Sequence, residues 1–441
     1  MTNVADATPV SGQVQPPARA SIRGLLAQTE IDLRLFGMLV ALAAILLTFN
    51  ILSGGKFFQP TNMITLAVQA SGVAIIATGM VLVIVSRNID LSVGSLVGVI
   101  AMTYALLMTD WMPSLLGMGA DFPFRWVIAL AIGIALGALI GGLQGFIIAY
   151  IGVPSFIVTL GGLLSIRGAV WYLSSGAAVS GLDPSFQLIG GGAQGSVGGT
   201  VTWVLGIAGC AAIIWLLIGN RRQRRRFDFP LRPMWAEVMI GVVGCLAVIG
   251  VAAFANANLW PQGLADRVAV EQGWGPTPEG GWKIPTGFPY PIILLIGVTL
   301  VMTWMATRRR FGRYVFAYGG NPDAAELAGI NTRWTILKTY VVMGVLCALA
   351  AAIASARLNG STLDVGQSYE LYVIAAAVVG GTSFAGGIGT IPGAVLGAFV
   401  MQSLAYGLSF MGVNSPGQNV VAGIVLILAV GFDAFNRRRG S

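Results

Sequence analysis

The chain has 441 residues, of which 56% are hydrophobic and only 10% are charged, and its formal net charge is +8. Soluble domains average about 25% charged residues, so this composition excludes an ordinary soluble protein. Several apolar segments exceed the roughly 18–20 residues that a helix needs to cross a bilayer, which predicts an all-α, polytopic transmembrane bundle. The positive charge is typical of cytoplasmic loops that fix topology, and nucleic acid is not an expected partner.

The reactive residue types are too few for a catalytic or metal site. Histidine is absent, which removes the usual general base and metal ligand, and the three cysteines lie inside apolar segments. Their spacing fits neither a disulfide framework nor a zinc site. We therefore expect no enzyme activity, no metal and no cofactor.

In chain order, a polar tail at 1–34 is predicted to be cytoplasmic, and residues 35–441 form the membrane domain. About twelve spans are expected in that domain. The segments 155–174 and 370–384 are weak or short, so either one could be discontinuous or re-entrant. The expected spans are 35–52, 63–86, 91–109, 126–151, 155–174, 199–219, 236–256, 288–306, 335–356, 370–384, 389–411 and 418–435.

The distribution of basic residues indicates the orientation of these spans. With the N-terminus inside, 19 of the 25 Lys and Arg residues fall on the inner side. This asymmetry predicts that both termini are cytoplasmic.

The turn between the second and third spans contains Arg87, Asp90 and Ser92, followed by Gly94 and Gly98. Asp90 can cap the helix that follows and Ser92 can bond locally, while glycines four residues apart allow close helix packing. The alternative role for Asp90 is as a ligand of a coupling ion or substrate. We favour capping, because Asp90 is expected at a loop edge rather than at bilayer depth.

A related pattern occurs at 386–397, where aligning Ile388 with Ile89 superposes Gly393 on Gly94. This is either a parallel internal repeat or a chance match among many glycines. A third stretch, 152–162, precedes Arg167 inside a span. Such an arginine faces the bundle interior or a polar cavity, so it either lines a path or pairs structurally, and we favour the structural role.

The segment 220–287 is predicted to be an inserted loop, helix and loop. Its outer part, 257–287, contains tryptophans and prolines that serve either as interfacial anchors or as a surface for an external partner. The segment 308–338 is a long charged stretch on the inner side, between two apolar segments. There Asn321 is suited to the N-cap of a short helix, Pro322 to its first position and Gly329 to its end. So short a helix is unstable alone, so we expect a partner protein to hold it.

The power source must lie outside the chain. No lysine occurs in the Gly-Lys-Ser/Thr context of a phosphate-binding loop, so the chain has no ATP site. Carboxylates are nearly missing from the spans, so a proton- or sodium-driven mechanism has little to use.

Four motifs together resemble the permease subunits of bacterial ABC importers of the ribose/xylose/galactose type, which are related to the branched-chain amino acid permeases. They are Ile89–Ser95, Gly152–Gly162, Gly320–Ile330 and Gly380–Gly387. An insertion at 220–287 is similar to that of the D-xylose permeases in this family.

The resemblance implies a multi-pass permease subunit in the bacterial inner membrane that imports a monosaccharide, D-xylose or a related pentose. It further implies a homodimer in membrane lipid, a separate cytoplasmic ABC ATPase and a periplasmic sugar-binding protein. The 308–338 segment then contains the coupling helix that seats in the ATPase, with the site residues Gly320, Asn321, Pro322, Asp323, Ala324, Ala325, Glu326, Leu327 and Gly329. Candidates for the path or gate are Asp90, Ser92 and Arg167.

Two other functions remain open from the residues alone. One is a stand-alone secondary carrier of a small polar solute, and the other is a membrane scaffold without transport.

Overall fold

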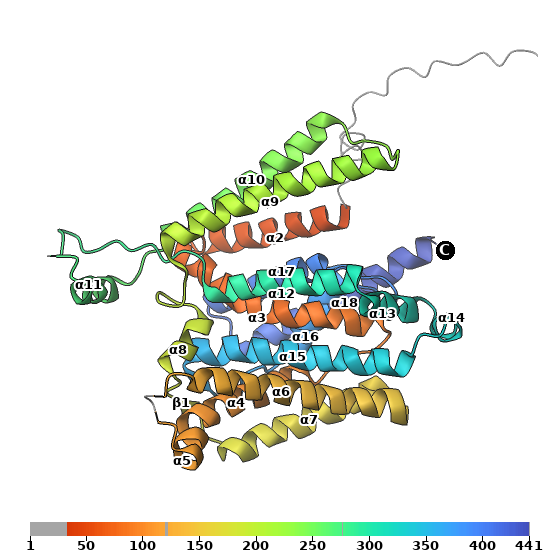
Figure 1. Cartoon of the computed structure of the whole chain (residues 1–441), viewed down its shortest axis with the longest axis horizontal. Helices are drawn as coiled ribbons and strands as arrows, with labels where there is room; N and C mark the ends of the chain where they lie inside the picture. The colour runs from red at the N-terminus through yellow and green to blue at the C-terminus, as the bar shows by residue number, and fades with distance from the viewer. Residues whose placement is uncertain (1–32, 120–121, 276, 441) are drawn as a thin grey trace, which may run out of the picture.

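The structure is a computed structural model that describes residues 33–119, 122–275 and 277–440. The predicted tail at 1–34 lies outside the described residues except for its last two positions. Within these described residues, ten helices are long and apolar enough to cross a membrane, and two shorter apolar helices accompany them (Figure 1). These twelve segments confirm the predicted fold class and agree with the expected spans.

The first part of the bundle runs back and forth between its two ends. Segment 155–174, which the sequence left open as discontinuous, is one continuous helix of 20 residues. Two stretches of π-helix extend the third and fourth spans. The elements are α2 (Leu33–Leu52), α3 (Pro60–Val85), α4 (Val93–Leu106), η1 (Leu107–Trp111), α5 (Met112–Leu116), α6 (Arg125–Phe146), η2 (Ile147–Ile151) and α7 (Ser155–Ser174).

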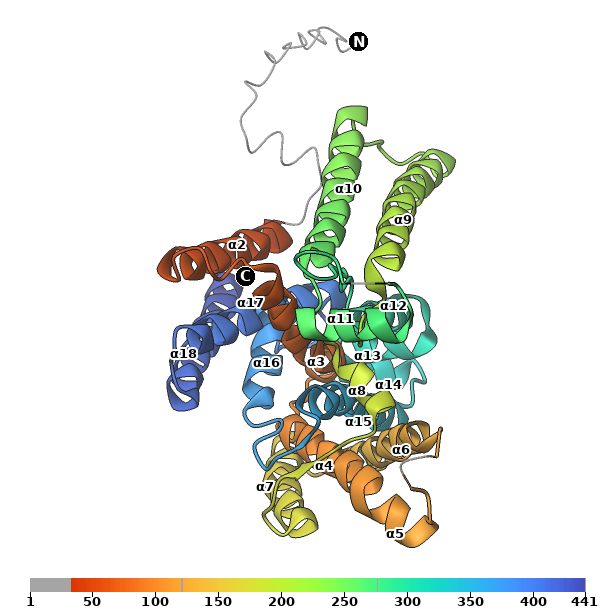
Figure 2. The same cartoon turned by 90° about the vertical axis from the view of Figure 1, so that its left-hand side faces the viewer.

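The predicted insertion, 220–287, contains the end of α9, all of α10 and the short helix α11, so the first part of its expected loop, 220–226, is helical. Helices α9 and α10 form a hairpin beside the main bundle, and α11 projects beyond one end (Figures 1 and 2). Two short helical elements precede the hairpin. The elements of this part are β1 (Val179–Ser180), α8 (Pro184–Gln187), η3 (Leu188–Gly190), α9 (Gly198–Arg226), α10 (Met234–Ala257) and α11 (Gln262–Glu271).

The last part contains a short helix, α16, of only 11 residues, which follows a non-helical segment at 362–368. Of the two segments predicted to be weak, this is the one that is interrupted. The elements are α12 (Tyr290–Arg308), α13 (Arg310–Gly320), α14 (Pro322–Leu327), α15 (Thr332–Leu358), β2 (Gly360–Ser361), α16 (Tyr369–Val379), α17 (Ile391–Phe410) and α18 (Ser415–Gly440).

The core is built around α3, which is buried along almost its whole length and packs against α12, α15, α16 and α17. Helix α4 is almost as buried, whereas α2, α7, α9 and α10 expose most of their apolar side chains. Apolar exposure of this kind is what lipid-facing helices require. Helices α3 and α4 therefore form the interior of a membrane bundle.

The two ends of the bundle differ in charge. Helices α13 and α14, the basic turn between α9 and α10, and the end of α18 gather at one end (Figure 1). Helix α8, α11 and the β1–β2 pair, in which Val179 faces Ser361, lie at the other. The basic end is the cytoplasmic one by the predicted charge asymmetry.

Two pairs of glycines bring α4 and α17 close to the interrupted span that contains α16. A Cβ atom at Gly94 or Gly98 would collide with the segment before α16, and one at Gly393 or Gly397 would collide with α16 or the turn after it. The facing carbonyl oxygens are those of Gly366, Val365, Gly380 and Ala376. The two similar motifs thus have the same structural use, while their origin in an internal repeat stays a prediction.

Candidate functional site

Helix α14 has the ends that the sequence predicted. The Asn321 side chain accepts a hydrogen bond from the Ala324 backbone N–H at 3.0 Å, and Pro322 is the first helical residue. Gly329 has a φ of +78°, and the Ile330 N–H donates to the Ala325 carbonyl oxygen at 3.1 Å. A left-handed glycine with this returning bond is a common way to end a helix.

The two faces of α14 differ in exposure. Ala325 is only 4% exposed and packs toward the chain itself, whereas Leu327 is 90% exposed. The acidic residues Asp323 and Glu326 are also exposed. The exposed side of this six-residue helix therefore carries two acidic residues and one leucine that has almost no contact with the rest of the chain.

Arg87 links the helix before α14 to the core. Its Nε donates to the Gly319 carbonyl oxygen at 2.7 Å and its Nη2 donates to the Gly320 carbonyl oxygen at 2.8 Å. Gly319 and Gly320 are the last residues of α13, and the negative end of the helix dipole there also favours a nearby cation. In addition, the Gly387 N–H donates to the Val85 carbonyl oxygen at 3.0 Å. The ends of α3 and α13 and the loop before α17 therefore meet at one junction.

Asp90 lies beyond this junction, between the spans α3 and α4, and is only 1% exposed. Its Oδ1 accepts hydrogen bonds from the Ser92 N–H at 2.9 Å and the Ser92 hydroxyl at 2.7 Å. The Ser92 hydroxyl also accepts from Gln144 Nε2 at 3.0 Å. Asp90 lies in the non-helical stretch between α3 and α4, as the sequence predicted, and its bonds to Ser92 are local. The favoured capping role is wrong, however, because the N-cap residue of α4 is Ser92 and no side-chain hydrogen bond caps this helix.

Burial has an electrostatic consequence for Asp90. Removal of the carboxylate from water raises its pKa above the ordinary value, and the hydrogen bonds from Ser92 act in the opposite direction. In the described part of the chain no cation forms an ion pair with it. Asp90 is thus an uncompensated buried acid at the start of α4.

Arg167 has a different set of contacts. Its Nη1 donates to the carbonyl oxygens of Leu363 at 3.0 Å and Val365 at 3.1 Å. Both carbonyls belong to the non-helical chain before α16, whose backbone has no helical partners of its own. Irregular backbone at membrane depth needs such partners, so these contacts agree with the favoured structural role.

The three candidate path residues do not form one group. Asp90 and Ser92 bond to each other, whereas Arg167 bonds to another segment. Sequence reasoning missed Gln144, which bonds to Ser92, and Tyr340, whose hydroxyl donates to the Ile89 carbonyl oxygen at 3.3 Å. These partners are distant in sequence, so no local signal could have revealed them.

Comparison with known proteins assigns the family. The family described as "Branched-chain amino acid transport system / permease component" matches residues 188–430. The xylose transport system permease protein of Haemophilus influenzae is 34% identical over 410 residues, which cover 93% of this chain and 98% of the relative. The ribose import permease protein of Escherichia coli K12 is 30% identical over 89% of this chain and 91% of the relative. The galactose/methyl galactoside import permease protein of the same strain is 29% identical over 91% and 95%.

No solved structure matches the chain. The family match covers more than half of the sequence, and the relatives align over nearly their whole length. Such permeases are not enzymes themselves, because ATP is hydrolysed by a separate subunit. The chain therefore belongs to the branched-chain amino acid transport system / permease component family and is a multi-pass inner-membrane permease subunit of an ABC importer.

Proposed function

We propose that this permease carries a monosaccharide, D-xylose or a related pentose, into the cytoplasm. The observation that carries the proposal is the 34% identity to a xylose permease across 93% of this chain and 98% of the relative. Because the alignment covers nearly all of both chains, the relative is long enough to contain a counterpart of the inserted segment 220–287.

We also propose that α14 is the coupling helix that seats in a groove of the ATPase subunit. Support comes from Leu327, which is 90% exposed at the cytoplasmic end although it is apolar. Burial of one leucine side chain against a partner is worth about 1.5–3 kcal/mol. The contacts of Arg87 would pass a displacement of α14 and α13 to the start of α4.

A second copy of the chain would meet the exposed face of α7. That face carries Gly161, Ser165 and Gly168, and a Cβ atom at either glycine would meet nothing within 4 Å. Small residues at this spacing let membrane helices approach closely, so we propose that the homodimer and its sugar path form along α7. The rest of the exposed apolar surface faces membrane lipid.

The outer segment 257–287 would receive the sugar-binding protein. The indole N–H groups of Trp260 and Trp282 are buried, and Trp282 packs edge-on against Trp274 at 5.4 Å between ring centroids. Trp274 itself stays about half exposed, which supports an aromatic contact surface on this loop. Deletion of the segment should abolish stimulation of uptake by the binding protein.

The test is reconstitution of the chain into vesicles with its ATPase and binding protein. Uptake of labelled D-xylose should require ATP and all three proteins, and Leu327→Arg should lose both the bound ATPase and uptake. Preference for ribose or galactose would overturn the substrate while leaving the coupling proposal intact. Gradient-driven uptake by the chain alone would overturn both.

A further inference from the structure

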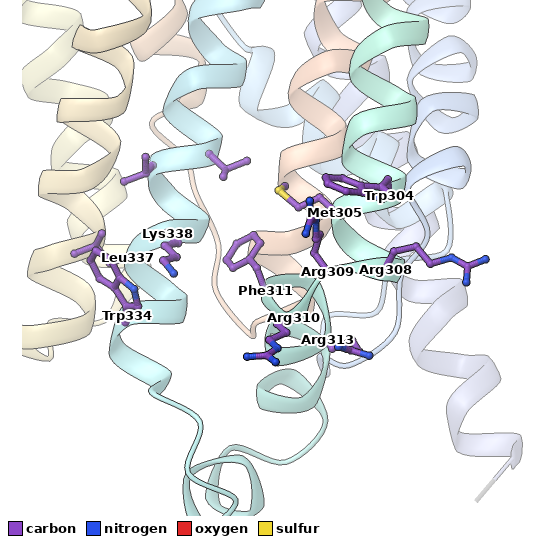
Figure 3. A pocket seen from close by; sticks show the side chains of 12 residues that line it. Trp304, Met305, Arg308, Arg309, Arg310, Phe311, Arg313, Trp334, Leu337 and Lys338 are labelled. Carbon is purple, nitrogen blue, oxygen red and sulfur yellow. The ribbon is translucent and has the colours of Figure 1, made fainter.

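A cavity of about 800 Å³ opens at the cytoplasmic end between α12, α13 and α15 (Figure 3). Its walls combine basic, aromatic and aliphatic side chains. The basic cluster at the start of the 308–338 segment supplies much of the lining, and the proposed coupling role does not use it. The residues are Trp304, Met305, Arg308, Arg309, Arg310, Phe311, Arg313, Trp334, Leu337, Lys338, Val341 and Val342.

A tight turn forms one side of this cavity. Arg309 is extended, with φ −92° and ψ 153°, so it separates α12 from α13. Gly312 packs directly against the carbonyl oxygens of Met305 and Ala306, and a side chain there would collide with both. The turn therefore holds α13 against the end of α12 and leaves a gap toward α15.

The charge of the cavity is one-sided. Five cationic side chains line it, and no carboxylate occurs among the twelve lining residues. Within the described ranges none of the five forms an ion pair. Figure 3 shows Lys338, Arg309 and Arg310 around the gap, whereas Arg308 and Arg313 extend toward the other side of α12. Three cationic side chains thus lie around a space whose lining residues include no anion.

The aromatic and aliphatic side chains place this space at the membrane surface. The Arg309 guanidinium lies 4.0 Å from the ring centroid of Trp304, and the Lys338 ammonium lies 4.9 Å from that of Trp334. Both indoles are about half exposed, as at a membrane–water interface. Val341 lies about one helical turn beyond Lys338, where its side chain both lines the cavity and comes close to Gly142 of α6.

We propose that this cavity binds the headgroup of an anionic phospholipid from the cytoplasmic leaflet. The phosphate lies among Lys338, Arg309 and Arg310, and an acyl chain runs along Val341 and Met305. Basic pockets between helices on the cytoplasmic side suit such headgroups. An acidic segment of the ATPase would also match the basic side chains, but it would leave the aliphatic side chains of the cavity without an apolar partner. The lipid would hold α12, α13 and α15 together directly beside α14.

The test is native mass spectrometry of the full chain in detergent, with phosphatidylglycerol, cardiolipin or phosphatidylethanolamine added. The double variant Arg310→Glu/Lys338→Glu should bind phosphatidylglycerol about tenfold or more weakly. The variant Arg310→Gln/Lys338→Gln should give a smaller loss in the same direction and replaces the first if it fails to fold. The matched control is Arg225→Glu/Arg226→Glu, which makes the same charge change in the exposed last turn of α9 and should bind as the unaltered chain does.

Three results would overturn the proposal. The first is equal retention of phosphatidylethanolamine and phosphatidylglycerol, and the second is displacement of phosphatidylglycerol by millimolar inorganic phosphate. The third is unchanged lipid binding in the double variant together with loss of the co-purified ATPase. That result would assign the cavity to the partner protein instead.

Discussion

Arg87 Nε donates to the Gly319 carbonyl oxygen at 2.7 Å across 232 residues of sequence. The bond joins the inner end of α3, the most buried helix, to the last turn of α13, from which α14 continues. Arg87 itself has a φ of +59°, which is uncommon for a residue with a side chain. Arg87 therefore combines an unusual backbone conformation with hydrogen bonds to α13, at the contact through which a displacement of α14 would reach α3.

Replacement of Arg87 should separate ATP hydrolysis from transport. In Arg87→Gly the backbone keeps its positive φ at no cost, so any defect reports the lost side chain. Two hydrogen bonds from a charged donor are removed, each worth about 1.5–3 kcal/mol. We expect normal binding of the ATPase but at least tenfold less ATP-driven uptake in vesicles.

The Arg87→Ala variant adds backbone strain to the same loss and should be less stable than Arg87→Gly. The control Arg226→Gly, in an exposed basic turn, should leave uptake unchanged. Full coupling in Arg87→Gly would show that the junction is only an anchor.

Charge reversal on α14 should weaken ATPase docking without unfolding the permease. Glu326 is exposed, so Glu326→Lys changes the docking surface alone, and we expect reduced co-purification of the ATPase at an unchanged melting temperature. Ala325→Arg should instead lower the melting temperature, because Ala325 is only 4% exposed and faces the chain. Equal ATPase recovery from Glu326→Lys and the unaltered chain would contradict a docking role for this face.

How much of this site was predictable depended on the range of the interactions. The caps of α14 follow from Asn321, Pro322 and Gly329 because each acts on backbone within a few residues. The spans follow from apolar length alone. The buried face of a six-residue helix shows no period, so Ala325 and Leu327 could not be told apart. The burial of Asp90 was missed because Gln144, on α6, lies 52 residues beyond Ser92.

The buried carboxyl of Asp90 should make stability fall as pH rises. Its pKa is raised in the folded chain, so the folded state holds this proton more tightly than the unfolded state does. The stabilisation is therefore complete below the ordinary aspartate pKa and is lost as pH rises through the folded pKa. In Asp90→Asn the amide oxygen can still accept from Ser92 without this loss.

The measurement is the melting temperature in detergent from pH 4 to pH 8. As pH rises, the melting temperature of Asp90→Asn should increase relative to that of the unaltered chain. Titratable neighbours on α15 are Tyr340 and Cys347, which both variants retain. If Asp90→Asn abolishes uptake and the pH dependence of its melting temperature is that of the unaltered chain, the carboxylate serves as a ligand rather than as a structural partner of Ser92.

Loss of Arg167 should act on folding more than on sugar affinity. Arg167→Ala leaves the carbonyl oxygens of Leu363 and Val365 without their donor, at about 1–3 kcal/mol for each buried group left unpaired. We expect a lower melting temperature and a lower maximal rate of uptake at an unchanged half-saturating sugar concentration. Arg167→Lys should recover part of the stability, since one ammonium can reach one carbonyl. A raised half-saturating concentration at full stability would place Arg167 in the sugar path instead.

A methyl group at Gly94 should be far more damaging than one on the exposed helix α10. The added Cβ atom would collide with the Gly366 carbonyl oxygen and the Glu370 carboxylate, and the backbone atom cannot rotate away. Overpacking of this kind costs about 1–3 kcal/mol, and we expect Gly94→Ala to lower the melting temperature and the yield of folded protein. Gly397→Ala should do the same, because it faces the Ala376 carbonyl oxygen in an equivalent way. Gly250→Ala is the matched control, since a Cβ atom there meets nothing within 4 Å and alanine favours the helix. Normal stability of Gly94→Ala would mean that the segment before α16 shifts freely, and the interrupted span would then be a moving part rather than a fixed one.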